Sequence, residues 1–271
     1  MFLLLSVSGA SCRIETLQVK LANKLQPYRP QLHLILRSDP DSFKSSLLHA
    51  MGEHHGVTPY QNVTFPAMIG TVDRNSGELV PGLVWQCRKK PFLLDEFKTG
   101  ERGDSAAVDV LLGVMEQGYY KRKIGLRSSS RSETDETDTT LFYRVENGEI
   151  EVRTRLAATI ATMKNWDMAR SGKYAALTQR CIPIRYSLTD DMVDAVLDGA
   201  PIYTHQEFNP PKHVTISRRD FLRIREIASA IRDERKEQLR PVYARTIGDL
   251  CRVLAITRRF DSELFRIICY L

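Results

Sequence analysis

The sequence predicts an α/β protein in which helices cover both faces of a parallel sheet, followed by a small domain built only of helices. Short apolar runs typical of buried parallel strands occur at residues 32–36, 92–94, 155–162 and 182–188. Stretches with apolar residues at helical spacing lie between these runs, as in residues 106–117. Because strands that alternate with helices pair in parallel, the first part of the chain is expected to form one sheet between two helix layers.

The last part of the chain shows a different pattern. Residues 221–231 and 247–256, and the tail through Ile267, have helical periodicity with no strand pattern between them. Residues 201–212 contain three prolines and are expected to form a linker. The predicted organisation is therefore an α/β core over residues 1–200, a linker over 201–216 and a helical lid domain over 217–271.

Two further stretches depart from the strand and helix patterns. Residues 127–140 are rich in Ser, Thr, Asp and Glu and are expected to form a mobile excursion from the core. Residues 1–5 are apolar, but the run is too short to span a membrane and no basic residue precedes it. We expect it to be a buried first helix or strand, and we expect neither a signal peptide nor a membrane partner.

Composition is that of an ordinary globular protein, with 42% hydrophobic and 27% charged residues over 271 positions. The net charge of +6 suits a polyanionic partner without identifying one. The five cysteines are dispersed and none forms a C-x-x-C pair, which argues against a disulfide framework or a cysteine zinc site. A cytosolic or nucleoid-associated location is expected, or a nuclear one in a eukaryote.

A candidate phosphate-binding loop follows the first predicted strand. It stands where a P-loop of pattern G-x-x-x-x-G-K-[ST] would lie, between a strand and a helix, so that backbone N–H groups face the phosphates. Lys44 would contact the outer phosphates, and the hydroxyl of Ser45 would hold Mg²⁺. The loop residues that would line the nucleotide are Ser38, Asp39, Pro40, Asp41, Ser42, Phe43, Lys44 and Ser45.

Both glycines of the P-loop pattern are missing from this segment. Ser38 replaces the first and Phe43 the second, although glycine is the residue that permits positive φ and close approach of phosphate. Asp41 adds a negative charge near the expected phosphate position. The alternative is an ordinary strand-to-helix turn with a solvated lysine.

A pair of carboxylates follows the second predicted strand. Asp95 could coordinate Mg²⁺, and Glu96 could orient an attacking water molecule. The alternative is a pair of solvated charges at the end of a strand.

The order of these segments resembles the minichromosome maintenance (MCM) family of replicative helicases along nearly the whole chain. S-D-P-D-S-F-K-S-S-L-L resembles the family's G-D-P-G-x-A-K-S-Q-L-L, and G-E-L-V-P-G-L-V resembles G-E-x-V-L-E-A-G-A-L-V. L-D-E-F, M-E-Q and A-L-T-Q-R are similar to I-D-E-F, M-E-Q and A-L-L-S-R. The segment from Ala244 to Leu254 resembles R-x-L-E-x-L-x-R-L. The family's N-terminal DNA-binding domain is not expected, because the loop begins within the first forty residues.

The resemblance implies an AAA+ P-loop NTPase fold, with ATP and Mg²⁺ as ligands. Asn165 would be the first sensor, although A-T-M-K-N-W departs from the usual A-A-A-N-P, and the alternative is a turn residue. Arg180 would be an arginine finger that reaches the site of a neighbouring subunit, which requires an oligomeric ring, typically of six subunits. Arg245 would be the second sensor, also acting across the interface. The alternative for both arginines is a solvated surface position.

For DNA, single- or double-stranded, the family uses a hairpin before the first sensor. Lys121, Arg122 and Lys123 lie at that place, with Lys123 expected at the tip. The alternative is an exposed basic turn.

Three functions are compatible with this sequence. The first is an ATP-driven motor on DNA that acts in replication, and the second is a non-hydrolysing structural or regulatory ring subunit. The missing glycines predict weak or absent ATPase activity. The third is an AAA+ protein-remodelling ATPase, which would show no salt-sensitive binding to DNA.

Overall fold

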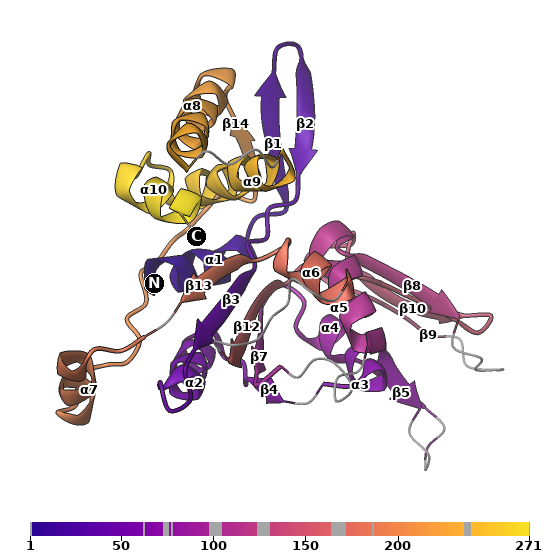
Figure 1. Ribbon diagram of the computed structural model, residues 1–271. Helices are drawn as coiled ribbons and strands as arrows, with labels where there is room; N and C mark the ends of the chain where they lie inside the picture. Colours follow the sequence, from indigo (N-terminus) through magenta and orange to yellow (C-terminus); the bar gives the residue numbers. More distant parts are fainter. Residues whose placement is uncertain are drawn as a thin grey trace.

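The computed structural model describes residues 2–61, 63–72, 76, 78–97, 105–123, 131–163, 172–185, 187–235 and 240–270. A parallel sheet lies at the centre, with helices on both of its faces (Figure 1). An antiparallel sheet extends from one side, and the C-terminal helices stack above with the hairpin formed near the chain start. Among the described residues, no helix combines the length and apolar character needed to cross a membrane.

The central sheet has five parallel strands, which confirms the predicted α/β class. Their order is β13 (Ile182–Arg185), β3 (Leu34–Ser38), β12 (Ala157–Met163), β7 (Pro91–Asp95) and β4 (Tyr60–Gln61). In register, Ile160 of β12 lies opposite Ile35 on one side and Leu94 on the other. Strands β3 and β7, which carry the predicted loop and the predicted carboxylates, are therefore separated by β12.

Alternate side chains of the central strands enter two different hydrophobic clusters. Leu34, Leu36 and Leu93 are buried on the face covered by α1 (Phe2–Ser11) and α2 (Lys44–His55). The opposite face packs against α3 (Phe65–Ile69), α4 (Leu83–Gln86) and α5 (Ser105–Gln117), with α6 (Gly172–Thr178) beside α5. Each fully buried aliphatic side chain stabilises the fold by ~1.5–3 kcal/mol. Helix α1 is the apolar start of the sequence, buried as expected.

A four-stranded antiparallel sheet follows α5, in the order β8 (Tyr119–Lys123), β11 (Glu149–Arg153), β10 (Phe142–Glu146) and β9 (Arg131–Thr134). Tyr143, Val145, Ile150 and Val152 point to its buried side, and the residues between them are mostly exposed. The expectation of a mobile excursion over 127–140 is wrong for residues 131–140, which form β9 and an ordered turn. Residues 127–130 lie outside the described residues.

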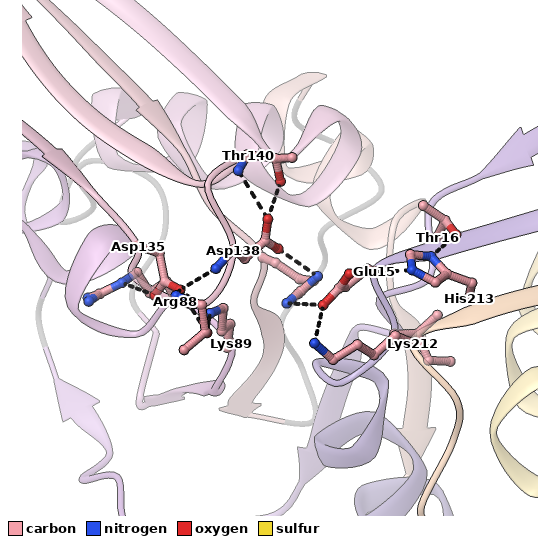
Figure 2. A network of polar contacts seen from close by, with 12 residues as sticks. Glu15, Thr16, Arg88, Lys89, Asp135, Asp138, Thr140, Lys212 and His213 are labelled. Carbon is pink, nitrogen blue, oxygen red and sulfur yellow. Dashed lines mark hydrogen bonds and ion pairs between the residues drawn. The ribbon is translucent and has the colours of Figure 1, made fainter.

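Buried ion pairs explain why this polar segment is ordered. Asp135 is 7% exposed and accepts hydrogen bonds from Arg88, at 2.8 Å, and from Lys89 (Figure 2). Asp138 pairs at 3.1 Å with Arg155, which lies two residues before β12. A buried carboxylate is tolerated where cations and hydrogen bonds compensate for its lost hydration. These ion pairs therefore attach the turn to the core through basic residues that are distant from it in the sequence.

The C-terminal helices pack on a second, three-stranded sheet. In it β14 (His213–Ile216) runs parallel to β1 (Thr16–Leu21), which forms a hairpin with β2 (Lys24–Tyr28). Helices α8 (Arg218–Arg235), α9 (Arg240–Thr257) and α10 (Ser262–Tyr270) share one hydrophobic core with α1 and this sheet. The end of the expected linker is thus a strand, and the helices contact the first part of the chain.

Two smaller features complete the described fold. Strands β5 (Gly70–Val72) and β6 (Leu79–Pro81) form a two-stranded sheet. Helix α7 (Asp190–Leu197) extends away from the body of the molecule, and none of its residues is buried. Its N-terminus is capped by Thr189, whose hydroxyl accepts a hydrogen bond from the backbone N–H of Met192.

Candidate phosphate-binding site

The candidate loop connects the end of β3 to the start of α2. Ser38 is the last residue of β3 and is buried, and α2 begins at Lys44. In the part of the chain that the structure describes, no side chain caps this helix, so the N–H groups of its first turn keep their hydrogen-bonding capacity. A helix N-terminus with free N–H groups favours an anion, and a phosphate group fits that requirement.

Two residues of the loop have a left-handed backbone without being glycine. Asp41 has a φ of 57° and Phe43, the residue before the helix, has a φ of 58°. This conformation costs a residue with a side chain roughly 1–2 kcal/mol. Phe43 was expected to occupy a position suited to glycine, and its backbone fits that expectation. Ser38 does not have a left-handed backbone, whereas Asp41 does. The MCM pattern G-D-P-G has glycine at the position of Asp41, so the pattern could have indicated a left-handed backbone there.

The loop is closed on its own polar groups. Lys44 Nζ donates to the carbonyl oxygen of Asp39 at 2.9 Å and to that of Ser38 at 3.3 Å. The hydroxyl of Ser42 donates to the carbonyl oxygen of Asp39 at 2.8 Å and is also bonded to the hydroxyl of Ser38. Because these contacts occupy the lysine and the serines, a phosphate group would have to displace them.

Asp95 lies at the end of β7 with an incompletely satisfied carboxylate. The residue is 2% exposed; its Oδ2 accepts a hydrogen bond from Gln61 Nε2 at 3.4 Å, and its Oδ1 has no partner among the described residues. A buried carboxylate oxygen without a partner is costly, and a cation would satisfy it. Gln61 comes from β4, and sequence reasoning missed it because β4 is a strand of only two residues. Glu96 follows with a φ of 48° and an exposed side chain.

Lys44 and the two carboxylates lie at the same edge of the sheet. Strands β3 and β7 are both parallel to β12, so the residues that end them face the same side. Burial lowers the pKa of Lys44, while the nearby carboxylates, with Asp95 foremost and Glu96 also contributing, act in the opposite direction. The two strands are not neighbours in the sheet: β12 lies between them, and they are about 9.6 Å apart. Asn165 lies outside the described residues.

The two arginines expected to act across a subunit interface lie at the opposite edge. Arg180 precedes β13, where Ile182 N–H bonds to the carbonyl oxygen of His33, just before β3 begins. It is therefore on the order of 15 Å from the loop along the strand direction. Its guanidinium pairs with Glu116 and donates to the carbonyl oxygen of Ala176 at 2.8 Å.

Arg245 lies on the same side of the sheet as Arg180. Burial raises the pKa of the Cys181 thiol, and the charges of Arg245 and Arg180 both oppose this effect. The two guanidinium groups are therefore close enough to act on one thiol.

The three basic residues expected to contact DNA lie on β8: Lys121, Arg122 and Lys123. Lys121 is paired with Glu149 at 2.9 Å and Glu151 at 3.1 Å, so part of its charge is already compensated. Arg122 stacks over Phe65, with its guanidinium carbon 4.4 Å from the ring centre. Lys123 is exposed at the end of the strand, and the residues after it lie outside the described part of the chain.

A second basic surface was not anticipated from the sequence. A groove at the start of α8 is lined by Arg218, Arg219 and Arg223 together with Phe260, and two carboxylates, Asp220 and Glu226, also line it. The guanidinium of Arg223 lies 4.3 Å from the ring centre of Phe260. The cluster R-R-D-F-L-R could have indicated it, because three arginines recur there within six residues.

No protein-family model matches this sequence, and no curated protein matches it at a significant level.

Proposed function

We propose that the chain binds a Mg²⁺–nucleoside triphosphate at the carboxyl edge of its parallel sheet, as a ring subunit of the MCM-like AAA+ type. The observation that carries this proposal is the placement of Lys44 and the half-satisfied Asp95 at the same edge, one strand apart. Ligands of parallel α/β sheets bind outside the carboxyl ends of the strands. The ends of β3 and β7 are about 9.6 Å apart across β12, a separation that phosphate groups and Mg²⁺ bound outside the strand ends would bridge.

Each residue has a chemical role in this arrangement. Lys44 would exchange the loop carbonyls for the outer phosphates, and the first-turn N–H groups of α2 would bind the same anion. Ser45 and Asp95 would hold Mg²⁺, for which the unpartnered Oδ1 of Asp95 is the fitting donor. When bound, the metal neutralises phosphate charge. Glu96 would orient the attacking water molecule.

We propose further that hydrolysis is weak or absent. The loop already satisfies Lys44 with its own carbonyl groups, and it holds a left-handed backbone at Asp41 and Phe43 without glycine. The Asp41 carboxylate also repels phosphate. These observations favour a regulatory or structural ring subunit over an efficient motor, as the second candidate function.

The test is binding of a fluorescent ATP analogue to the purified chain, with Mg²⁺ and with a chelator. Lys44→Ala should lower the affinity at least tenfold, because a charge-assisted contact to phosphate is lost. The control is Lys24→Ala, an exposed lysine of the β1–β2 hairpin, which should leave the affinity unchanged. Magnesium-dependent binding that persists in Lys44→Ala would contradict the proposal.

The DNA partner is tested in the same preparation. A ring subunit of a DNA-acting protein should bind DNA with an affinity that falls steeply with salt, since phosphate contacts release counterions. Lys123→Ala and Arg219→Ala, on the two basic surfaces, should each weaken binding and reduce the salt slope. Nucleotide binding without any salt-sensitive DNA binding would favour a protein-remodelling ATPase instead.

A further inference from the structure

Three histidines converge where the phosphate-loop helix ends. His54 and His55 are the last two residues of α2, and His205 comes from the segment between α7 and β14. One ring nitrogen from each lies within 4.8 Å of the corresponding atom in the other two. The rings of His54 and His205 stack at 3.6 Å between centres, and His55 stands edge-on to both.

The His205 ring is oriented by a chain of hydroxyl groups. Its Nδ1 is hydrogen-bonded to the Tyr203 hydroxyl at 2.9 Å, and that hydroxyl contacts the Ser6 hydroxyl of α1 at 3.4 Å. The bond engages Nδ1 and leaves Nε2 as the nitrogen available to a ligand. Metal-binding histidines are commonly held in this way, with the second ring nitrogen bonded to a neighbouring group.

His55 has an unsatisfied buried nitrogen. Its Nε2 is buried without a partner among the described residues. The ring lies against Gly9 of α1, where a Cβ atom would stand 2.4 Å from that nitrogen. A side chain at position 9 would therefore expel the ring, and glycine is what allows α1 to accept it. An unpaired buried imidazole nitrogen costs free energy that a bound cation would recover.

We propose that His54, His55 and His205 form a binding site for a divalent transition metal of the Zn²⁺ class. Three imidazole nitrogens are a ligand set typical of Zn²⁺, with a fourth position left for water. Zn–N distances of about 2.0–2.1 Å require the three nitrogens to lie about 3.3 Å apart, so the stacked rings of His54 and His205 must turn to close on the ion. Near the cluster, the guanidinium of Arg13 donates hydrogen bonds to the carbonyl oxygen of Phe208 and to the side chain of Asn209.

The metal would tie together parts of the chain that are distant in sequence. It would join the end of α2, whose first residue is Lys44, to the segment that leads into the C-terminal helices. The 12 residues of α2 place the metal about 18 Å from the phosphate loop. The site is thus separate from the proposed nucleotide site, and either proposal can fail without the other.

The test is calorimetric titration of Zn²⁺ into the full chain, prepared without a histidine tag and freed of metal. We expect one ion per chain, a dissociation constant below about 1 µM, and a metal-dependent rise in Tm. His205→Phe keeps an aromatic ring for the stack but removes the ligand, and it should weaken binding about 10- to 100-fold, as should His54→Ala. Two variants serve as matched controls, His49→Ala on an exposed turn of α2 and His213→Ala on β14; both should bind as the wild type does.

Co²⁺ gives an independent readout, because tetrahedral coordination produces visible absorption that His205→Phe should abolish. Circular dichroism of the variants shows whether they remain folded. Zn²⁺ binding that His205→Phe and His54→Ala leave unchanged would overturn the proposal, and so would a wild-type affinity weaker than about 100 µM. In either case the cluster would be a packing contact between rings.

Discussion

At the scale of single residues, the candidate phosphate-binding loop combines a suitable position with unsuitable backbone chemistry. Asp41 and Phe43 adopt the left-handed backbone conformation that glycine adopts without strain in such loops. Because both residues carry a side chain, this conformation raises the conformational energy of the folded state. Lys44 is bound by the carbonyl groups of the same loop. A nucleotide must therefore compete with contacts inside the protein before it gains any of its own.

Asp41→Gly should raise both stability and nucleotide affinity. Removing the left-handed side chain should stabilise the fold by about 1 kcal/mol, and removing the carboxylate should strengthen phosphate binding several-fold. The matched control is Ala22→Gly in the β1–β2 turn, where φ is 50°: it should stabilise similarly but leave nucleotide affinity unchanged. Thermal unfolding and analogue titration measure the two effects. An equal gain in affinity in both variants would show that Asp41 has no direct influence on the phosphate.

The residues of this site differ in how far the sequence could predict them. Lys44 and Asp95 follow apolar runs that are recognisable as strands, so their shared edge was predictable from the parallel order alone. Gln61 was not, because a two-residue strand has no periodicity to detect. The pairing of Arg180 with Glu116 also depends on how α5 and α6 pack, which no local pattern encodes.

At the scale of elements, runs of apolar residues predicted the buried strands and the long helices, whereas alternating strands were missed. The pattern F-Y-R-V-E has Tyr143 and Val145 buried between exposed residues, which is the period of a half-buried strand. Its neighbourhood of Ser, Thr and Asp concealed this signal. Asp135 is ordered because Arg88 and Lys89, 46 or more positions earlier, neutralise it.

Asp135→Asn should destabilise the protein by about 2–4 kcal/mol, since it leaves Arg88 and Lys89 without their carboxylate. Burial acts to raise the pKa of Asp135, but the hydrogen bonds from Lys89, Arg88 and Thr137 outweigh it, so the net pKa is far below its usual value. A lowered folded pKa means that the stabilisation is complete above the unfolded value near 4 and is lost as pH falls through the folded pKa.

Denaturant unfolding at several pH values measures this effect. The difference between wild type and Asp135→Asn should be constant from about pH 5 to 7 and should shrink below about pH 4. Glu146→Gln, at an exposed position of the same sheet, is the control and should change stability by less than about 0.5 kcal/mol. A difference that stays constant down to pH 2 would exclude the ionised carboxylate as its cause.

At the scale of the whole molecule, the candidate site is divided between two edges of one sheet. Lys44 and Asp95 occupy the carboxyl edge, and Arg180 and Arg245 occupy the other. In the proposed assembly, neighbouring chains arranged head to tail in a ring would bring these groups together.

Mixing two inactive variants tests this arrangement. Lys44→Ala lacks the loop cation and Arg180→Ala lacks the proposed arginine finger. If the chain forms the proposed ring, a mixed ring would contain some interfaces in which both groups are intact. In the Asp41→Gly background, the mixture should hydrolyse ATP faster than either variant alone, as measured by phosphate release. Glu116→Gln removes the ion pair of Arg180 within the chain but leaves its hydrogen bond to the carbonyl oxygen of Ala176, and it should not abolish activity. A mixture no faster than its parts would place Arg180 outside the reaction.

The parallel pairing of β1 with β14 has a mechanical consequence. Hydrogen bonds from Thr16 to Val19 attach the chain start to the strand that leads directly into α8. If the C-terminal helices tilt when a nucleotide binds, the β1–β2 hairpin must rotate together with them. Dyes placed on the hairpin tip and on the antiparallel sheet would then report that rotation as a change in energy transfer. A cut in the chain between Leu21 and Lys24 would leave the tilt of the helices intact but abolish the coupled movement of the hairpin.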